Sequence, residues 1–183
     1  MSDGDSLKQQ TVRGTIWSAI ERFSVQGIQF IILIVMARVL TPSDYGIVGM
    51  LTIFLAISQS LIDSGFSNAL IQKIDRTETD YATVFYFNIA VGGILYGIMY
   101  FSASGIADFY DIPELISVTR IISLLLLINS LSIVQRAIFT IRIDFKTQAK
   151  ASLIAVVISG IVGISMAYSG YGVWSIVAQT LVN

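Results

Sequence analysis

A line of polar side chains runs along the first long apolar segment of the chain. Its members recur at intervals of 4, 3, 4, 4 and 3 residues and are Thr11, Thr15, Ser18, Arg22, Gln26 and Gln29. Residues three and four apart lie on one face of a helix. The other faces carry large apolar residues such as Phe23, Phe30 and Ile31. This pattern predicts a helix with one side suited to water or a polar ligand and the other suited to lipid.

Arg22 is the strongest candidate for a binding role in this segment. An arginine in the middle of a membrane helix costs about 2.5–3.5 kcal/mol on insertion scales, so such residues usually face a bundle interior or an aqueous cavity. The alternative is that Arg22 reaches back to the lipid headgroups or pairs locally, because it lies only about two turns from the start of the segment. Gln26 and Gln29 lie deeper on the same face, and snorkelling would not require them. We therefore interpret Ser18, Gln26 and Gln29 as residues that line a cavity.

A second polar line follows in the next apolar segment. It consists of Tyr45, Gly49, Thr52, Gln59, Asp63 and Ser67. We expect it to face the same space as the first line, which makes Asp63 a further candidate for lining the cavity. The alternative is that Asp63 pairs with an arginine for structural reasons, while Ser and Thr side chains hydrogen-bond to their own helix backbone.

The composition is that of a membrane protein. Of the 183 residues, 55% are hydrophobic and 13% are charged, and the mean hydropathy is +0.78. Soluble domains average about 45–50% apolar and 25% charged residues. The chain contains no Cys and no His, which excludes disulfides and a thiol nucleophile and removes the usual metal ligands. We expect no catalytic residue, no metal site and no cofactor, and the net charge of −1 gives no indication of a nucleic acid partner.

Apolar windows long enough to cross a membrane account for nearly the whole chain. A helix needs about 20 apolar residues for this, and five windows fit, over 15–39, 45–70, 82–104, 116–139 and 151–168, with a partial sixth over 173–183. Pro42 and Pro113 fall between windows. Asp44 and Glu114 follow them, where each is expected to cap the next helix or complement its dipole. The prediction is an all-α polytopic transmembrane bundle forming one membrane domain over 1–183.

Basic residues alternate between the connections. They gather in the N-terminal tail, in the second connection and beside the fourth, as Lys8, Arg13, Lys73, Arg76, Arg136, Arg142, Lys146 and Lys150. The third connection has no basic residue but carries Asp108, Asp111 and Glu114. Because cytoplasmic loops of membrane proteins are enriched in Lys and Arg, this distribution predicts a multi-pass protein with its N-terminus in the cytoplasm.

Gly93 and Gly97 form a GxxxG pattern inside the third apolar window. Glycines at this spacing let two membrane helices approach closely. We interpret the pair as helix-packing residues.

Three stretches resemble a known family. They are RVLTPSDYGIVGM from Arg38, DSGFSNALIQK from Asp63 and the basic RIDFK from Arg142. These stretches are similar to the Wzx-type polysaccharide and lipopolysaccharide biosynthesis flippases of the multidrug/oligosaccharidyl-lipid/polysaccharide (MOP) superfamily. The resemblance covers nearly the whole chain from Thr11 onward.

The resemblance implies a fold of two six-helix lobes around a cavity that opens alternately to the two sides of the bacterial inner membrane. The implied cargo is an undecaprenyl-pyrophosphate-linked oligosaccharide for O-antigen, capsule or exopolysaccharide. Because family members are commonly more than twice this length, the chain is expected to be a truncated N-terminal lobe that lacks its C-terminal lobe. Further implied partners are membrane lipids and a polysaccharide polymerase or chain-length protein.

The residue pattern and the resemblance agree on one role for the cavity. A cationic side chain suits a pyrophosphate, and polar uncharged faces suit sugars. Arg22 is therefore the expected pyrophosphate ligand, and Ser18, Gln26, Gln29 and Asp63 are the expected lining residues.

Three other functions are alternatives. The nearest is a drug or cation antiporter similar to the MATE type, for which Glu21 or Asp63 would matter more than Arg22. A membrane polymerase or glycosyltransferase is the second, although the chain offers no His, no Cys and no persuasive acidic motif for it. A noncatalytic membrane scaffold is the third, for which helix packing alone would suffice.

Overall fold

The computed structural model describes residues 22–62, 77–141 and 145–183, and all regular secondary structure among them is helical. A first helix, Arg22–Ala37, is followed by α2 (Pro42–Ile62), α4 (Glu78–Tyr110), α5 (Glu114–Ile122), α6 (Leu124–Ile141), α7 (Phe145–Tyr168) and α8 (Val173–Val182). The predicted all-α polytopic bundle is confirmed.

Most of these helices are long enough to cross the thickness of a lipid bilayer. Within the described residues, four segments are long and apolar enough to cross a membrane, namely Pro42–Ile62, Thr79–Tyr110, Glu114–Ile133 and Thr147–Tyr168. Arg22–Ala37 and Val173–Val182 are shorter apolar helices. The chain is thus a membrane protein, while the total number of crossings stays a prediction because the windows over 15–39 and 45–70 extend outside the described residues.

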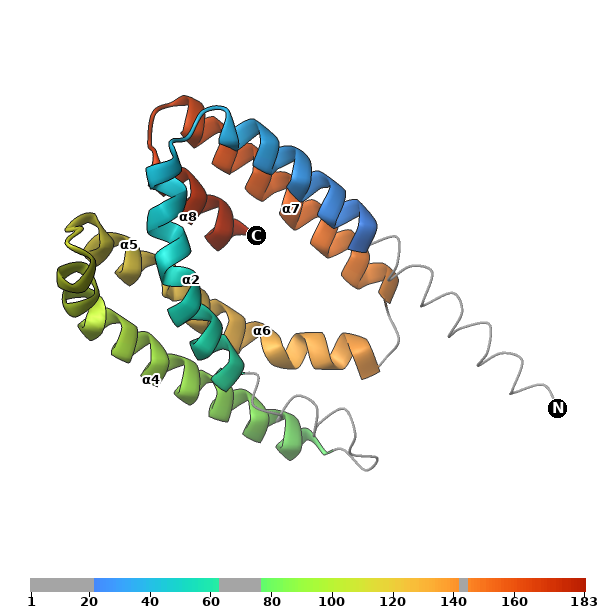
Figure 1. The fold of residues 1–183 in the computed structure, drawn as a ribbon. Coiled ribbons are helices and arrows are strands. Elements are labelled where there is room, and N and C mark those ends of the chain that lie inside the picture. Colours follow the sequence, from blue (N-terminus) through green and yellow to red (C-terminus); the bar gives the residue numbers. More distant parts are fainter. Residues whose placement is uncertain (1–21, 63–76, 142–144) are drawn as a thin grey trace.

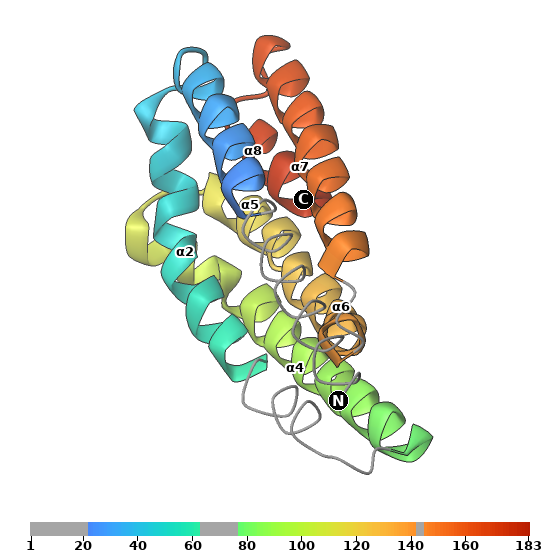
Figure 2. The same cartoon turned by 90° about the vertical axis from the view of Figure 1, so that its right-hand side faces the viewer.

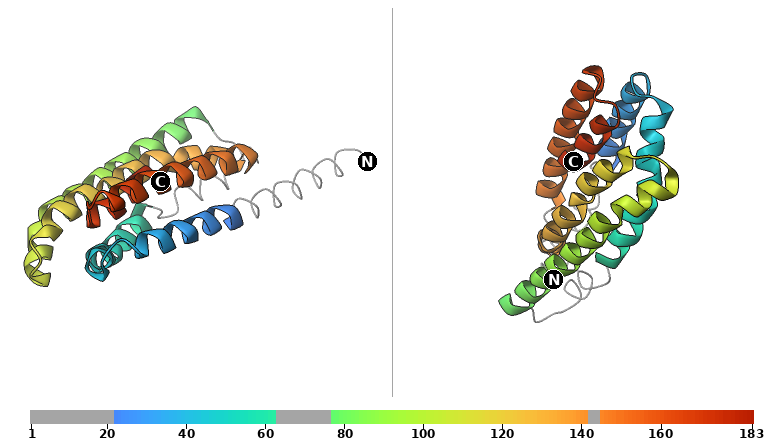
Figure 3. Two further views of the ribbon diagram at one scale, coloured as in Figure 1. Left: turned by 90° about the horizontal axis from the view of Figure 1, so that it is seen from above. Right: turned by 90° about the vertical axis from the view of Figure 1, so that its left-hand side faces the viewer.

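The helices form two pairs that diverge from one end of the molecule (Figure 1). The Arg22–Ala37 helix lies along α7, α4 lies along α6, and α2 and α8 lie between the pairs near the end where they converge. Figures 2 and 3 show the same helices from other directions. The molecule therefore has two arms joined by α2 and α8.

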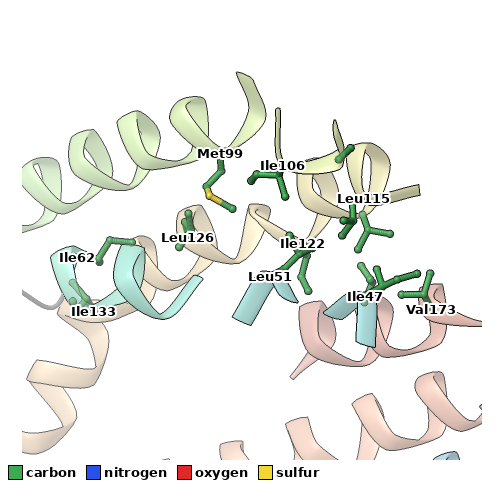
Figure 4. Close-up of a cluster of buried hydrophobic side chains, with 13 residues drawn as sticks. Ile47, Leu51, Ile62, Met99, Ile106, Leu115, Ile122, Leu126, Ile133 and Val173 are labelled. Atoms are coloured by element: carbon green, nitrogen blue, oxygen red, sulfur yellow. The ribbon is translucent and has the colours of Figure 1, made fainter. Parts of the chain in front are cut away.

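The larger cluster of buried apolar side chains joins α2, α4, α5, α6 and α8 (Figure 4). Leu51 of α2, Leu115 of α5, Leu126 of α6 and Val173 of α8 are each no more than 1% exposed. Lipid tails are as apolar as these side chains, so close van der Waals packing rather than exclusion of water must hold such helices together.

A second, smaller cluster lies between the Arg22–Ala37 helix, α7 and α8. Ile32 and Met36 of the first helix are buried there with Val156 of α7 and Ile176 of α8. The residue after Ile176, Val177, belongs to the larger cluster. Helix α8 therefore packs into both clusters and determines how the two arms are placed relative to each other.

Close helix approach in the α4 arm depends on Gly92. A Cβ added there would lie 2.6 Å from Ser130 Oγ and 3.1 Å from the carbonyl oxygen of Leu126, both on α6. A Cβ at Gly93 or Gly97 would meet nothing within 4 Å among the described residues. The expectation that the GxxxG pair packs against another helix is therefore wrong within this part of the chain, because the contact face of α4 is centred one residue earlier.

The window over 116–139 forms two helices instead of one. Helix α5 ends at Ile122 and α6 begins at Leu124. Between them, the buried Ser123 donates its hydroxyl to the carbonyl oxygen of Arg120 at 3.1 Å. Ser123 keeps helical backbone angles (φ −66°, ψ −12°), so the two helices continue in nearly the same course and together form the apolar span Glu114–Ile133.

Asp44 caps α2 as expected. Its Oδ2 accepts hydrogen bonds from the backbone N–H of Thr41 at 2.8 Å and from the Thr41 hydroxyl at 2.7 Å. Glu114 lies in the first turn of α5, where its charge complements the helix dipole, and the N-cap position is Pro113, which makes no side-chain cap. Both acidic residues therefore lie where a negative charge favours the start of a helix.

Candidate functional site

A groove of about 380 Å³ lies between the Arg22–Ala37 helix and α8, beside the start of α2. Its walls are formed by Gln26, Gln29, Phe30, Leu33, Met36, Tyr45, Ile176, Gln179, Thr180 and Asn183. Small-molecule pockets are usually apolar with a few well-placed polar groups, and have volumes of about 300–1,000 Å³. The groove has this composition and lies near the lower end of that range.

Two of the predicted cavity residues, Gln26 and Gln29, lie in this groove. They come from the polar face that helical periodicity indicated, while Phe23 and Ile31 on other faces of the same helix are exposed as expected for lipid contact. A role for the two glutamines in binding a substrate stays a prediction.

The other predicted site residues are not part of the groove as described. Arg22 is exposed at the start of the described helix, one turn before Gln26, and is not among the lining residues. Ser18 and Asp63 lie outside the described residues. The structure thus brings together two members of the predicted set, and the Cα of Arg22 lies one helical turn before them, outside the lining.

The second polar line does not face the groove as a whole, which corrects the expectation that both lines share one space. Among its described members, Tyr45, Gly49, Thr52 and Gln59, only Tyr45 lines the groove. Gln59 Oε1 accepts a hydrogen bond of 2.8 Å from Asn129 Nδ2 on α6, and the Thr52 hydroxyl donates to the carbonyl oxygen of Val48 at 3.0 Å. These polar groups serve the packing of the other arm or bond to their own helix, as in the alternative interpretation.

The opposite wall of the groove was missed from the sequence. It consists of Gln179, Thr180 and Asn183, which follow one side of α8 to its end. A signal existed, because Gln179 and Thr180 are adjacent polar residues in a mostly apolar helix. Nothing in the local sequence, however, indicates that α8 faces the Arg22–Ala37 helix.

A glycine on α7, Gly163, allows this wall to lie close to α7. A Cβ added at Gly163 would lie 2.8 Å from the Cβ of Gln179 and 3.4 Å from Met36 Sδ. Both of these residues line the groove. Glycine at 163 therefore permits α8 and the Arg22–Ala37 helix to approach α7 at the depth where the groove forms.

The turn before α8 is also built on glycine. Gly172 precedes the helix with φ 53° and ψ −129°, a conformation that disfavours other residues. A Cβ there would lie 2.9 Å from Asp44 Oδ1, at the start of α2. The entrance to α8 is thus packed against the same end of α2 that supplies Tyr45.

The groove offers uncharged hydrogen-bonding groups on an apolar wall. A carboxamide supplies both donors and an acceptor, whereas a hydroxyl can do either. The Thr180 hydroxyl donates to the carbonyl oxygen of Ile176 at 2.7 Å, which leaves its lone pairs for a ligand. The Tyr45 hydroxyl is buried and has no partner among the described residues, so the tyrosine presents mainly its ring. These groups are suited to binding a polar, uncharged molecule.

A second described arginine within a helix lies in the other arm. The Arg120 guanidinium carbon of α5 is 4.5 Å from the centre of the Tyr100 ring of α4. A cation over an aromatic face is held by the electrostatics of the ring. Arg120 therefore packs α5 against α4 and does not contribute to the groove.

Comparison with known proteins gives one consistent result. A family model described as "Polysaccharide biosynthesis protein" matches residues 35–183. The teichuronic acid biosynthesis protein TuaB of Bacillus subtilis is 28% identical over 84% of this chain and 32% of its own length. The succinoglycan biosynthesis transport protein ExoT of Rhizobium meliloti is 26% identical over 93% of this chain and 35% of its own length.

A third relative is the lipopolysaccharide biosynthesis protein WzxC of Escherichia coli. It is 24% identical over 65% of this chain and 24% of its own length. The chain thus spans about a third or less of the length of these relatives. No solved structure matches it.

Proposed function

The chain belongs to the family of polysaccharide biosynthesis proteins, and we propose that it forms the N-terminal lobe of a flippase for an undecaprenyl-pyrophosphate-linked oligosaccharide. In this proposal the complete protein works by alternating access in the bacterial inner membrane, with the N-terminus in the cytoplasm. It delivers a precursor of cell-surface polysaccharide, and it forms or breaks no covalent bond.

The observation that carries the proposal is the position of Gln26 and Gln29. Polar side chains in a membrane helix usually face a bundle interior or a water-filled cavity. These two lie in a groove of about 380 Å³ opposite the polar residues of α8. A lobe that contributes one wall of a hydrophilic pathway needs such a face, whereas a membrane scaffold does not.

Arg22 has a distinct part in this proposal. It follows the same helical face, and its guanidinium can donate paired hydrogen bonds to the oxygens of a pyrophosphate. A positive charge within the membrane also stabilises an anionic cargo while it crosses the bilayer. The C-terminal lobe would supply the opposite side of the pathway.

The relatives favour transport over the alternatives. Two are named for biosynthesis of teichuronic acid and of lipopolysaccharide, and one is named a succinoglycan biosynthesis transport protein. They give no support to an antiporter of the MATE type, and their names suggest no catalytic activity for this chain.

The test is deletion of the complete gene in the native host, followed by complementation. We expect loss of the surface polysaccharide and accumulation of the lipid-linked oligosaccharide in the inner membrane, and both should be reversed by the complete gene. Lipid-linked oligosaccharide should be extracted and quantified beside surface glycan. Loss of surface glycan without accumulation of precursor would point to a synthetic enzyme and contradict the proposal.

A further inference from the structure

The groove is uncharged along its whole described lining. Its polar members are the carboxamides of Gln26, Gln29, Gln179 and Asn183 and the hydroxyl residues Tyr45 and Thr180. Strong binding of phosphate groups in proteins uses charge-assisted hydrogen bonds from cations such as Arg and Lys. A lining of this kind is therefore poorly suited to a pyrophosphate.

The same groups match the chemistry of a sugar. Each ring hydroxyl is both a donor and an acceptor, and a carboxamide can satisfy both roles from one side chain. Phe30 and Tyr45 add aromatic surface to the lining, and aromatic side chains combine a large apolar face with a rigid shape. The groove thus offers hydrogen bonds for hydroxyls and apolar surface for C–H faces.

Arg22 lies on the polar face that enters the groove. It precedes Gln26 by four residues, which is about 6 Å along a helix axis. Its side chain is exposed and outside the lining set. A cation therefore lies one helical turn before an uncharged groove. The lipid-linked cargo has its groups in the same order, because its charged pyrophosphate is followed by uncharged sugars.

We propose that this groove is a subsite for the uncharged sugars next to the lipid anchor, and that the pyrophosphate binds outside it, at Arg22. This assignment rests on the proposed function. The volume of about 380 Å³ lies near the lower end of small-molecule pockets, so the groove holds a short segment of the glycan rather than the whole oligosaccharide.

Two probes separate the two parts of the cargo. Undecaprenyl pyrophosphate carries the anion and no sugar, whereas the lipid-linked oligosaccharide extracted from the host carries both. Binding of each to the purified complete protein in nanodiscs is measured for the wild type, for Gln29→Ala combined with Gln179→Ala, and for Arg22→Gln. Alanine at 179 keeps the Cβ that packs near Gly163, so the packing of α8 is preserved.

The double glutamine variant should bind the lipid-linked oligosaccharide about tenfold more weakly, the change expected for loss of one net hydrogen bond. Its affinity for undecaprenyl pyrophosphate should be unchanged. Arg22→Gln should weaken both probes. Gln148→Ala is the matched control, because this half-buried glutamine of α7 lies outside the groove and its replacement should change neither affinity.

Equal losses for both probes in the double variant, or no loss for either, would overturn the assignment. Gln26→Ala provides a second variant at an exposed position, for use if the double variant is unstable, and the same comparison of the two probes applies to it. Failure of the proposed function looks different, because the wild-type protein itself would then bind neither probe.

Discussion

The two arms of the molecule use polar residues in opposite ways. In the arm of α4, α5 and α6, polar groups tie helices together. Asn129 of α6 donates a hydrogen bond to Gln59 of the joining helix α2, and Arg120 of α5 lies over the Tyr100 ring of α4. Between the Arg22–Ala37 helix of the other arm and the joining helix α8, the amides of Gln29 and Gln179 face a groove.

Glycine also acts differently in the two arms. Gly92 brings α4 close to Ser130 and Leu126 of α6, whereas Gly163 lets Gln179 and Met36, which line the groove, approach α7. The comparison teaches that a polar residue in a membrane helix indicates either packing or a pathway, and that the neighbouring helix decides between them. Four changes test this division, from the largest expected effect to the smallest.

Charge reversal at Arg22 should have the largest effect. Arg22→Glu in the complete protein would put a carboxylate where the pyrophosphate is proposed to bind, and like charges repel. We expect surface glycan to be abolished while membrane insertion and abundance stay normal. Surface glycan assays and quantitative immunoblots of membrane fractions measure the two readouts.

Arg22→Lys is the control for this change, because it keeps the charge and loses the paired donors. It should retain part of the activity. If Arg22→Glu prevents membrane insertion, Arg22 is a structural residue. It would then no longer count as a cargo-binding residue in the comparison of the two arms.

Gly163→Ala should impair transport more than it impairs stability. The new Cβ would lie 2.8 Å from the Cβ of Gln179, so α8 must shift and the groove must change shape. We expect surface glycan to fall several-fold, because a displacement of about 1 Å at a binding site is enough for large losses. The unfolding temperature in detergent should fall only modestly.

Gly97→Ala is the matched control for this substitution. A Cβ at Gly97 meets nothing within 4 Å among the described residues, so neither transport nor stability should fall. Normal transport by a stable Gly163→Ala protein would indicate that the groove wall does not take part.

Gly92→Ala should show the reverse balance. The added methyl would lie 2.6 Å from Ser130 Oγ, and overpacking of this kind destabilises by about 1–3 kcal/mol. We expect a lower unfolding temperature in detergent, with transport reduced only in proportion to the folded protein. Gly93→Ala, one residue along the same helix, adds a Cβ that meets nothing within 4 Å in the part of the chain that the structure describes, so it should leave the unfolding temperature unchanged or raise it.

The smallest effect is expected at the hydrogen bond between α2 and α6. Asn129 Nδ2 donates to Gln59 Oε1 over 2.8 Å, and such bonds between membrane helices average about 0.6 kcal/mol in double-mutant cycles. A cycle of Asn129→Ala and Gln59→Ala, followed by unfolding, should yield a coupling of about this size without loss of transport. A strong transport defect in either single variant would indicate that these residues line the transport pathway. It would contradict their assignment to helix packing.

Several features followed from the sequence alone because they depend on local spacing. Helical periodicity put Gln26 and Gln29 on one face with Arg22, and the composition predicted a membrane bundle. The cap at Asp44 was also predictable, since a cap involves only residues a few positions apart. The family resemblance, read from short motifs, was confirmed by the match over residues 35–183.

Other features required the packing of distant segments. Gln179 became a groove residue only because α8 faces the Arg22–Ala37 helix, and Gln59 became a packing residue only because Asn129 lies across from it. Within the described residues, the close approach of α4 to α6 lies at Gly92 and not at the GxxxG pair, because one residue along a helix turns the contact face by about 100°.

The sequence by itself therefore determined the class of protein, its family and the polar face of its first helix. Tertiary structure alone decided that the polar face of the Arg22–Ala37 helix lies across a groove from the polar residues of α8. It also decided that Gln59 of α2 is hydrogen-bonded to α6. The physical reason is that the burial and hydrogen bonding of a helical face depend on the rotation and depth of its neighbours, and residues such as Gly92 and Gly163 set these through contacts with segments far away in the chain.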